Sequence, residues 1–523
     1  MIHAAWLSAL LTVGAVAAAA TAKSTVKTTN GLITGHPSSN ISSVTEFLGI
    51  PFAQPPNGTL RFAPPQAYSG SSPYVAASYG LDCPYTPNPA VGFPDFTPQA
   101  QRVINYFSAN SGTPQGEDCL TLNVWTPCTG LPIVAKKVPV LIFFYGGRFT
   151  YGHTNSPFFD GEFLARSQNV VVVTVNHRDN IFGFPGAPGI PQNVGLRDQR
   201  LAVEWLQTNV AGFGGDPAKM VLFGQSAGAV AIDYWAYSYV ANPIVTGLIS
   251  ESGNALSFPL NTAAGTLSNW YNVTQTLGCG ATPDSIACMR TKNWTNIKAA
   301  AAKAPAASSG NPLRSIPAFY PTPDNDTVFT NYTYLESIGA FAKLPYLLGN
   351  NDFEQGYYAL PSFKKNITVT IDQGDQFLLG SFTCPNDYQA RARIAQGVPT
   401  WLYRYFGDWP NVNLYPANDD YPGQVVSQGS GAYHGAELEM VFGNPSGVSG
   451  LPNTANENKM IALMQGAWAA FAKNPKTGLT AYGWPVFNPN THSLIRLAYN
   501  NAGTADFVSP GLYNQCANFM PSA

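Results

Sequence analysis

The feature that most constrains the fold is the segment 220–228, MVLFGQSAG, in which an apolar run leads into a G-x-S-x-G motif. The run is typical of a buried strand, and the small residues after Ser226 are typical of the start of a helix. A serine on so sharp a strand-to-helix turn has strained backbone angles, and flanking glycines remove the Cβ atoms that would block the turn. The motif therefore predicts that the Ser226 hydroxyl stands exposed above a sheet and acts as a nucleophile.

Short apolar runs elsewhere in the chain extend this prediction to a whole sheet. They are hydrophobic on both faces and mostly rich in β-branched residues, as strands covered by helices on both sides should be. A helical pattern over 201–210 ends at the glycine-rich stop 212–215. Strands that alternate with helices predict an α/β fold with a mainly parallel sheet. Besides Met220–Phe223, the runs are Val138–Phe144, Val170–Val175, Val245–Ile249, Leu344–Leu348 and Trp401–Tyr405.

The overall charge excludes one class of partner. The chain of 523 residues has 27 Lys+Arg and 29 Asp+Glu, so a net charge of -2 provides no field that would hold a nucleic acid. Charged residues make up 11% and hydrophobic residues 45%, which argues against disorder. Residues 299–312, rich in Ala, Ser and Pro, are interpreted as a surface insertion. We therefore expect one large catalytic domain over residues 23–523.

The N-terminus predicts secretion. Residues 4–20 are almost entirely apolar and end in Ala20-Thr21-Ala22, a small-x-small cleavage site, so residues 1–22 are interpreted as a signal peptide. No later segment is long and apolar enough to cross a membrane. Seven N-x-S/T sequons fit a glycosylated protein that is secreted, either free or associated with the cell wall. Their asparagines are Asn40, Asn57, Asn272, Asn293, Asn325, Asn331 and Asn366.

A serine hydroxyl needs a base to take its proton, and only two histidines follow Ser226. In folds that carry this elbow, the chain order is nucleophile, acid, histidine. His434 lies in a glycine-flanked loop before an apolar stretch, whereas His492 lies in a polar turn. We therefore favour His434 as the base and interpret His492 as a solvated turn residue.

The acid is expected between the serine and the histidine, at the end of a strand. The run Leu344–Leu348 is followed by a loop that holds both Asp352 and Glu354. Either carboxylate could orient the imidazole and stabilise its cation, so spacing does not choose between them. After Val138–Phe144 comes YGGRF (145–149), whose glycines would let backbone N–H groups approach a developing oxyanion.

Several other motifs along the chain, together with the Ser226 elbow, indicate a family resemblance. From about residue 30 to beyond 440, the chain resembles the type-B carboxylesterase/lipase family, the cholinesterase-like branch of the α/β-hydrolases, and secreted fungal members look closest. Besides the Ser226 elbow, the motifs are FLGIPFA (47–53), LRF (60–62), EDCL (117–120), GLRDQR (195–200), FGGDP (213–217) and HGAELE (434–439).

The resemblance implies an α/β-hydrolase fold with long insertions and a serine ester hydrolase that acts through an acyl-enzyme. It places the nucleophile at Ser226, the base at His434 and the acid at Glu354, although Gln355 separates that glutamate from the glycine that usually follows it. Asp352 therefore stays an alternative. Neither a cofactor nor a metal is implied, and no H-E-x-x-H spacing is present.

The resemblance also implies an oxyanion hole made by the backbone N–H groups of Gly147, Arg148 and Ala227. Arg148 stands where the family usually has glycine, which leaves three interpretations of its side chain. It narrows the pocket, pairs with an acidic substrate or points into solvent.

Seven cysteines are present, and their connectivity does not follow from sequence alone. The resemblance implies the disulfides Cys83–Cys119, Cys279–Cys288 and Cys384–Cys516, with Cys128 left over, and a structural pair of Glu117 with Arg61. Residues 84–118 lack the tryptophan with which cholinesterases bind quaternary ammonium. That loop instead resembles a flap of the lipase kind, or simply packs down through its aromatic residues.

Two other functions stay open at this level. One is a non-catalytic adhesion or binding protein, a fate known among cholinesterase-like proteins that lost the nucleophile. The other is an acyltransferase or a peptidase on the same fold, because fold alone does not separate these reactions. The expected partner is a small-molecule ester, not a nucleic acid or a membrane interior. The physiological ester and the oligomeric state cannot be deduced from the sequence.

Overall fold

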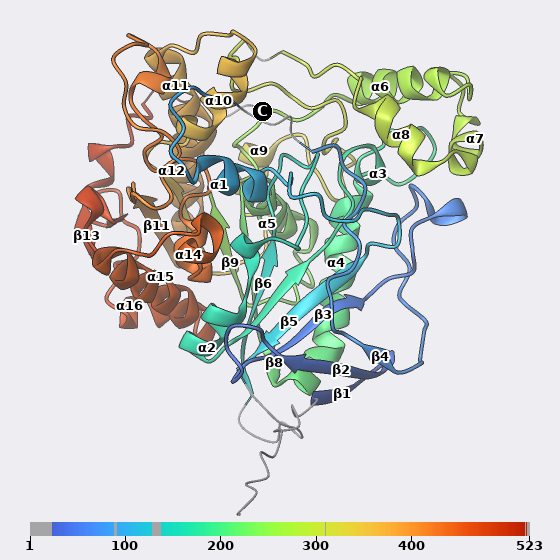
Figure 1. Ribbon diagram of the computed structural model, residues 1–523, viewed down its shortest axis with the longest axis horizontal. Coiled ribbons are helices and arrows are strands. Elements are labelled where there is room, and N and C mark those ends of the chain that lie inside the picture. Colours follow the sequence, from blue (N-terminus) through green and yellow to red (C-terminus); the bar gives the residue numbers. More distant parts are fainter. Residues whose placement is uncertain (1–23, 88–91, 128–136, 309, 518, 520–523) are drawn as a thin grey trace, which may run out of the picture.

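In the computed structural model of the protein, residues 24–87, 92–127, 137–308, 310–517 and 519 are described. The expected signal peptide and Cys128 lie outside these residues. A single sheet of 13 strands runs through the molecule (Figure 1). The strands are β1 (Ser24–Thr28), β2 (Gly31–Pro37), β3 (Thr45–Pro51), β4 (Tyr74–Val75), β5 (Thr121–Thr126), β6 (Val138–Phe144), β7 (Val171–Val175), β8 (Gly215–Gln225), β9 (Gly247–Glu251), β10 (Tyr346–Asn351), β11 (Thr400–Tyr405), β12 (Leu494–Leu497) and β13 (Ala505–Val508).

Helices fill most of the connections between these strands. The α-helices are α1 (Ala100–Phe107), α2 (Glu162–Gln168), α3 (Asn180–Gly183), α4 (Val194–Asn209), α5 (Ala227–Ser238), α6 (Ala263–Thr276), α7 (Ser285–Thr291), α8 (Trp294–Ala301), α9 (Tyr332–Ser337), α10 (Gln355–Lys364), α11 (Ile371–Leu378), α12 (Cys384–Ala395), α13 (Leu438–Phe442), α14 (Pro445–Ser449), α15 (Ala455–Lys473) and α16 (Gly478–Ala481). Short 3₁₀ or π turns lie at Gly58–Leu60, Pro157–Phe159, Val210–Phe213, Leu379–Thr383, Val425–Ser427, Tyr499–Asn501 and Pro510–Leu512.

The centre of the sheet is parallel, as predicted. The order is β1-β2-β3-β5-β7-β6-β8-β9-β10-β11-β12-β13, and every pair from β7 to β12 is parallel. All six runs that the sequence singled out form strands of this centre. Strand β10 begins two residues later than expected, because Pro345 has no N–H to contribute to a sheet. The outer strands β1, β2, β3 and β5 are antiparallel and were not predicted.

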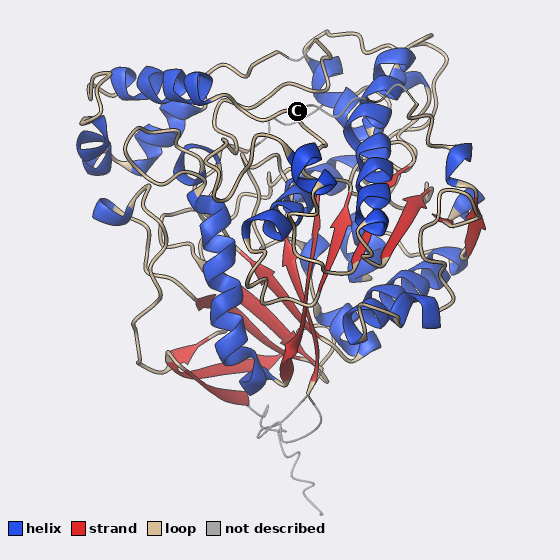
Figure 2. Cartoon of the chain, turned by 180° about the vertical axis from the view of Figure 1, so that it is seen from behind, coloured by secondary structure: helices blue, strands red, loops and turns tan. Residues whose placement is uncertain are grey.

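Alternate side chains of each central strand enter two different cores, which explains why these strands are apolar throughout. On β6, Leu141 and Phe143 belong to the core that includes Met464 and Trp468 of α15. Their neighbours Val140 and Ile142 belong to the core that includes Val203 of α4 and residues of α5. Helices accordingly lie on both sides of the sheet (Figure 2). This is the α/β architecture with a mainly parallel centre that the sequence predicted, and it agrees with the α/β-hydrolase fold that the resemblance implied.

The remaining segments lie outside these layers. Helices α6, α7 and α8 gather at one side of the molecule, away from the sheet (Figure 1). The Ala/Ser/Pro-rich segment begins in α8 and continues into residues 302–308, most of which are exposed. Within the described residues, no helix combines the length and apolarity needed to cross a membrane.

Candidate active site

Ser226 lies on a strained turn between β8 and α5. Its backbone angles, φ 57° and ψ −122°, lie outside the regions that L-residues favour. The two glycines of the motif make the turn fit: a Cβ on Gly224 would lie 2.7 Å from the carbonyl oxygen of Phe144, and one on Gly228 would lie 2.0 Å from it. A hydrogen bond of 2.8 Å from the Ser226 N–H to the Glu251 carbonyl holds the turn in place. Close packing of the elbow on β6 and β9 therefore fixes the position of the serine.

His434, which lines the same pocket as Ser226, contacts Glu354 although 80 positions separate them. The histidine Nδ1 lies 2.5 Å from Oε2 of the glutamate, and both side chains are buried. The other carboxylate oxygen of Glu354 accepts a 2.8 Å bond from the Asn351 N–H at the end of β10. The competing carboxylate, Asp352, instead forms an ion pair of 2.7 Å with Arg404. The structure thus places Glu354, and not Asp352, against the histidine, whereas His492 lies exposed in its turn.

The second ring nitrogen of His434 has a partner that the sequence did not predict. The side-chain amide nitrogen of Gln225 lies 3.1 Å from Nε2. Gln225 directly precedes the serine, so the same turn that presents Ser226 also presents this amide. Tyr358 of α10 packs its ring 4.9 Å from the His434 ring and lines the same pocket as Ser226. Burial raises the pKa of Tyr358, which keeps its phenol protonated.

The turn after β6 supplies the expected oxyanion-hole positions. Gly147 has φ 111°, and a Cβ there would lie 1.9 Å from the Tyr151 carbonyl oxygen, so only glycine fits. Arg148 has φ 57°, a left-handed conformation that glycine adopts more easily than arginine. Ala227 is the first residue of α5, where backbone N–H groups have no acceptor within the helix. Gly147 borders the first of the two pockets described next, Ala227 borders the second, and Arg148 borders both.

Two pockets adjoin at Ser226 and Arg148, which border both. The first, here called the His434 pocket, has an empty volume of about 480 Å³ and contains His434 and several aromatic rings. The second, here called the Arg314 pocket, has an empty volume of about 320 Å³. Its described lining combines the apolar side chains of Phe258, Pro259, Ile316 and Pro317 with Arg314 and Tyr320.

The loop closed by the first disulfide forms part of the His434 pocket. Tyr106 and Phe107, at the end of α1, line it, and the Phe107 ring centre lies 6.3 Å from that of His434. Helix α1 is held down by Arg102, which donates to the carbonyl oxygens of Val448 at 2.8 Å and Gly447 at 3.0 Å. The loop is therefore a wall of the site, packed by its aromatic residues in this structure.

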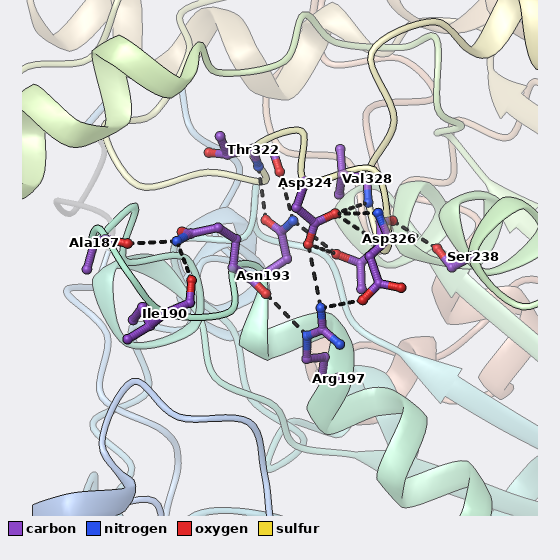
Figure 3. A network of polar contacts seen from close by, with 11 residues as sticks. Ala187, Ile190, Asn193, Arg197, Ser238, Thr322, Asp324, Asp326 and Val328 are labelled. Carbon is purple, nitrogen blue, oxygen red and sulfur yellow. Dashed lines mark hydrogen bonds and ion pairs between the residues drawn. The ribbon is translucent and has the colours of Figure 1, made fainter.

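A network of polar contacts holds the chain segment that follows Tyr320 (Figure 3). The Asn193 amide donates to the Thr322 carbonyl at 2.8 Å and accepts from the Thr322 N–H at 3.0 Å. Asp324 accepts from the N–H groups of residues 326–328, and Arg197 of α4 contacts Asp324 at 3.6 Å. These contacts fix one wall of the Arg314 pocket to the N-terminal end of α4.

A second buried glutamate near the histidine was missed by sequence reasoning. Glu437 accepts a hydrogen bond from the Asn351 side-chain amide and one of 3.3 Å from the Ser252 hydroxyl. Burial is the main cause that raises the pKa of Glu437, and the negative charge of Glu354 raises it further. The Glu437 carboxyl therefore keeps its proton to a higher pH than an exposed glutamate does. The motif HGAELE contains Glu437 three residues after His434, which was the available signal.

The structure forms the three disulfides that the resemblance implied: Cys83–Cys119, Cys279–Cys288 and Cys384–Cys516. Arg61 donates two hydrogen bonds of 2.5 Å to Glu117, as expected. The asparagines of all seven sequons are exposed, namely Asn40, Asn57, Asn272, Asn293, Asn325, Asn331 and Asn366. The Asn40 amide nitrogen, however, donates to Glu162.

Comparison with known proteins connects this site to a family. The model of the carboxylesterase family matches residues 22–378 and 374–515. The chain is 32% identical over 535 residues to secreted lipase 5 of Gibberella zeae, covering 95% of this chain and 94% of the relative. It is 30% identical over 494 residues to a chlorogenic acid esterase of Aspergillus niger, covering 90% of each chain. Lipase 2 of Diutina rugosa is 34% identical over 538 residues and 91% of each chain.

Proposed function

The chain belongs to the carboxylesterase family, and we propose that it is a secreted serine ester hydrolase in which Ser226, His434 and Glu354 form the catalytic triad. One observation carries this proposal. A carboxylate and an imidazole joined at 2.5 Å lie beside a serine on a strained elbow, in the pocket that both the serine and the histidine line. Such an arrangement lets a base remove the serine proton while the acid stabilises the resulting cation.

In the proposed reaction, the Ser226 oxygen attacks the ester carbonyl while His434 Nε2 takes the hydroxyl proton. Nε2 is free for this task only when the Gln225 amide, now 3.1 Å away, moves aside. The N–H groups of Gly147, Arg148 and Ala227 receive the negative oxygen of the tetrahedral intermediate. His434 then gives its proton to the departing alcohol, and an acyl-serine forms. Water activated by His434 releases the acid and restores the hydroxyl.

The test is hydrolysis of p-nitrophenyl esters from acetate to palmitate by the wild-type protein and by Ser226→Ala. We expect the variant to lose the activity, because the nucleophile is gone, with the fold intact by circular dichroism. A stoichiometric organophosphate should inhibit the wild type and add its mass to the peptide that contains Ser226. A Ser226→Ala protein that hydrolyses esters at the wild-type rate would refute the mechanism.

The same assay separates the alternative functions. No turnover together with no labelling of Ser226 would favour a binding protein. Labelling without turnover would indicate a working nucleophile with a more specialised substrate. Added alcohol acceptors test acyl transfer: a new ester formed in preference to the free acid would replace hydrolysis as the reaction.

We propose that secretion removes residues 1–22, so that the mature chain begins at Lys23. The similarity to the relative named secreted lipase 5 and the three disulfides support export to an oxidising environment outside the cell. Expression in a fungal host, followed by N-terminal sequencing of the protein in the medium, tests this. Retention of the protein inside the cell, or a mature chain that still carries the apolar run, would contradict it. Loss of mass after treatment with an N-glycosidase would show glycans on the exposed sequons.

A further inference from the structure

The two pockets that meet at Ser226 would hold the alcohol half and the acyl half of an ester separately. His434 must reach the leaving oxygen to protonate it, and His434 lines the first pocket but not the second. Under the proposed function, the alcohol half therefore lies in the His434 pocket. The acyl half then extends from Ser226 into the Arg314 pocket, which begins at Ala227 and Arg148.

Two guanidinium groups border that acyl side without a counter-charge. Arg148 donates to the Ser315 carbonyl, and Arg314 donates to the Ser257 carbonyl at 3.2 Å. Within the described part of the chain, the ion pairs of arginine use other residues, and neither Arg148 nor Arg314 has one. The Nε of Arg314 is buried and has no hydrogen-bond acceptor among these residues. A desolvated donor of this kind is costly unless an acceptor arrives with the ligand.

The other residues that line the Arg314 pocket determine which kind of ligand could bring an acceptor to Arg314. Tyr320 lines the same pocket, and the charges of Arg148 and Arg314 both act to lower the pKa of its phenol, against the larger effect of burial. The other side chains of the lining are mostly apolar, and the described residues that line the pocket include no aspartate or glutamate. Burial lowers the pKa of Arg314, and Tyr320 in the same lining partly opposes this shift. The pocket thus suits a short apolar chain or ring that ends in an anion.

We propose that the Arg314 pocket selects esters whose acyl group carries a second, ionised carboxylate, that is, half-esters of dicarboxylic acids. A guanidinium presents paired N–H donors that match the two oxygens of a carboxylate, and such charge-assisted bonds are among the stronger ones in proteins. The proposal rests on the proposed ester hydrolase activity and deepens it, because it names the substrate class of the same site. Arg148 then has a role that glycine at this position would lack.

The test compares two esters that share the same adipoyl chain, p-nitrophenyl hydrogen adipate and its methyl-capped neutral analogue, with spontaneous hydrolysis measured in the presence of the Ser226→Ala protein. We expect kcat/KM for the charged ester to exceed that for the neutral ester by about tenfold at low salt. The ratio of the two values should fall as sodium chloride is added, because salt screens the pairing. A wild-type ratio at or below one, with the neutral ester hydrolysed, would overturn the inference and leave the proposed function standing. Loss of both activities, with Ser226 unlabelled, would overturn the proposed function itself.

Two variants probe the arginines independently. Arg148→Gly removes the guanidinium, keeps the backbone N–H and suits the left-handed backbone at this position. Arg314→Gln removes the other charge, and Arg314→Lys keeps it. We expect Arg148→Gly and Arg314→Gln each to lower the charged-to-neutral ratio by about tenfold, and Arg314→Lys to retain most of it.

Arg166→Gln is the matched control, because Arg166 is an exposed arginine at the end of α2. It should leave the ratio unchanged. Equal charged-to-neutral ratios of kcat/KM in wild type, Arg148→Gly and Arg314→Gln would show that neither arginine recognises the carboxylate of the acyl group. This result would refute the inference even if the wild-type enzyme prefers the charged ester.

Discussion

Glu354 and Asp352 are only two positions apart but have different partners. This difference is the reason for assigning Glu354 as the acid of the triad. Glu354 lies at the start of α10, buried, with one oxygen on His434 and the other on the Asn351 N–H. Asp352 points to Arg404, and about a third of its side chain, 36%, is exposed. The two substitutions that neutralise these groups are therefore expected to act differently.

Glu354→Gln should lower kcat by about 10³- to 10⁴-fold, because the amide can neither hold the imidazole tautomer nor stabilise its cation. Asp352→Asn should change kcat little, because Asp352 contacts Arg404 and not His434, and it should lower stability by about 1–3 kcal/mol, because the buried Arg404 loses its carboxylate partner. Steady-state kinetics with a p-nitrophenyl ester measure both. If only the Asp352 substitution removed activity, the acid would be Asp352.

A single glycine provides a second test at this scale. Gly228 lies in α5, where alanine is the better helix former by about 1 kcal/mol. A Cβ there would nevertheless lie 2.0 Å from the Phe144 carbonyl oxygen. We expect Gly228→Ala to lower the free energy of unfolding by about 1–3 kcal/mol. The melting temperature and the esterase activity should therefore fall together. Gly511→Ala is the control, because its new Cβ would meet its nearest atom, the Ser509 hydroxyl, at 3.7 Å; equal melting temperatures for the two variants would contradict the clash.

At the scale of elements, a buried ionic network joins three helices behind the sheet. Asp233 of α5 accepts a 2.8 Å bond from Arg393 of α12, and both side chains have no exposed surface. Glu336 of α9 accepts a 2.7 Å bond from the Tyr237 hydroxyl, also in α5. Burial raises the pKa of Glu336 to about 8 from an ordinary 4.5, although Arg393 opposes the shift. Packing of these helices thus depends on the protonation of one glutamate.

The sign of this dependence follows from proton binding. Between pH 4.5 and about 8 the folded protein holds a proton on Glu336 that the unfolded chain has released. The contribution of this group to stability is therefore complete below pH 4.5 and is lost as the pH rises through about 8. We expect Glu336→Gln, which mimics the protonated form, to match wild type near pH 4.5 and to exceed it by roughly 2–4 kcal/mol at pH 9.

Urea unfolding at several pH values measures this difference. Glu204→Gln, on the exposed surface of α4, is the control and should show no such growth between pH 6 and pH 9. A Glu336→Gln gain that is the same at every pH would mean that the folded protein does not hold the proton.

At the scale of the whole molecule, disulfides connect segments that are far apart in the chain. Cys384–Cys516 spans a sequence separation of 132 and fastens the C-terminal segment to the start of α12, beyond the edge strands β12 and β13. Cys279–Cys288 spans only 9 residues within the group of helices α6 to α8. A crosslink restricts the unfolded chain more when the loop that it closes is longer.

Replacing both cysteines of the long bridge with alanine should lower the free energy of unfolding by about 5 kcal/mol. Replacing Cys279 and Cys288 should lower it by about 2.5 kcal/mol, which makes the second pair the matched control. Denaturant unfolding under non-reducing conditions gives both values. A larger loss from the short bridge would show that loop closure is not the main contribution of these disulfides.

Local patterns in the sequence determined the elbow and the parallel centre of the sheet. The apolar runs identify β6 to β11 because a strand covered on both faces has to be apolar throughout, and G-x-S-x-G identifies Ser226 because few residues fit so tight a turn. Chain order and loop composition were enough to favour His434 over His492. The half-exposed outer strands, such as β1, carry no comparable signal, because their side chains alternate between core and solvent.

Only the tertiary structure decided which distant side chains meet. It brought Glu354 to His434, directed Asp352 to Arg404 and placed the Gln225 amide on the second histidine nitrogen. It also placed Arg314 beside Arg148, which lies 166 positions earlier in the chain. The reason is physical: the direction of a side chain depends on the rotamers and backbone turns that packing selects, and that packing joins segments whose separation along the chain leaves no local pattern.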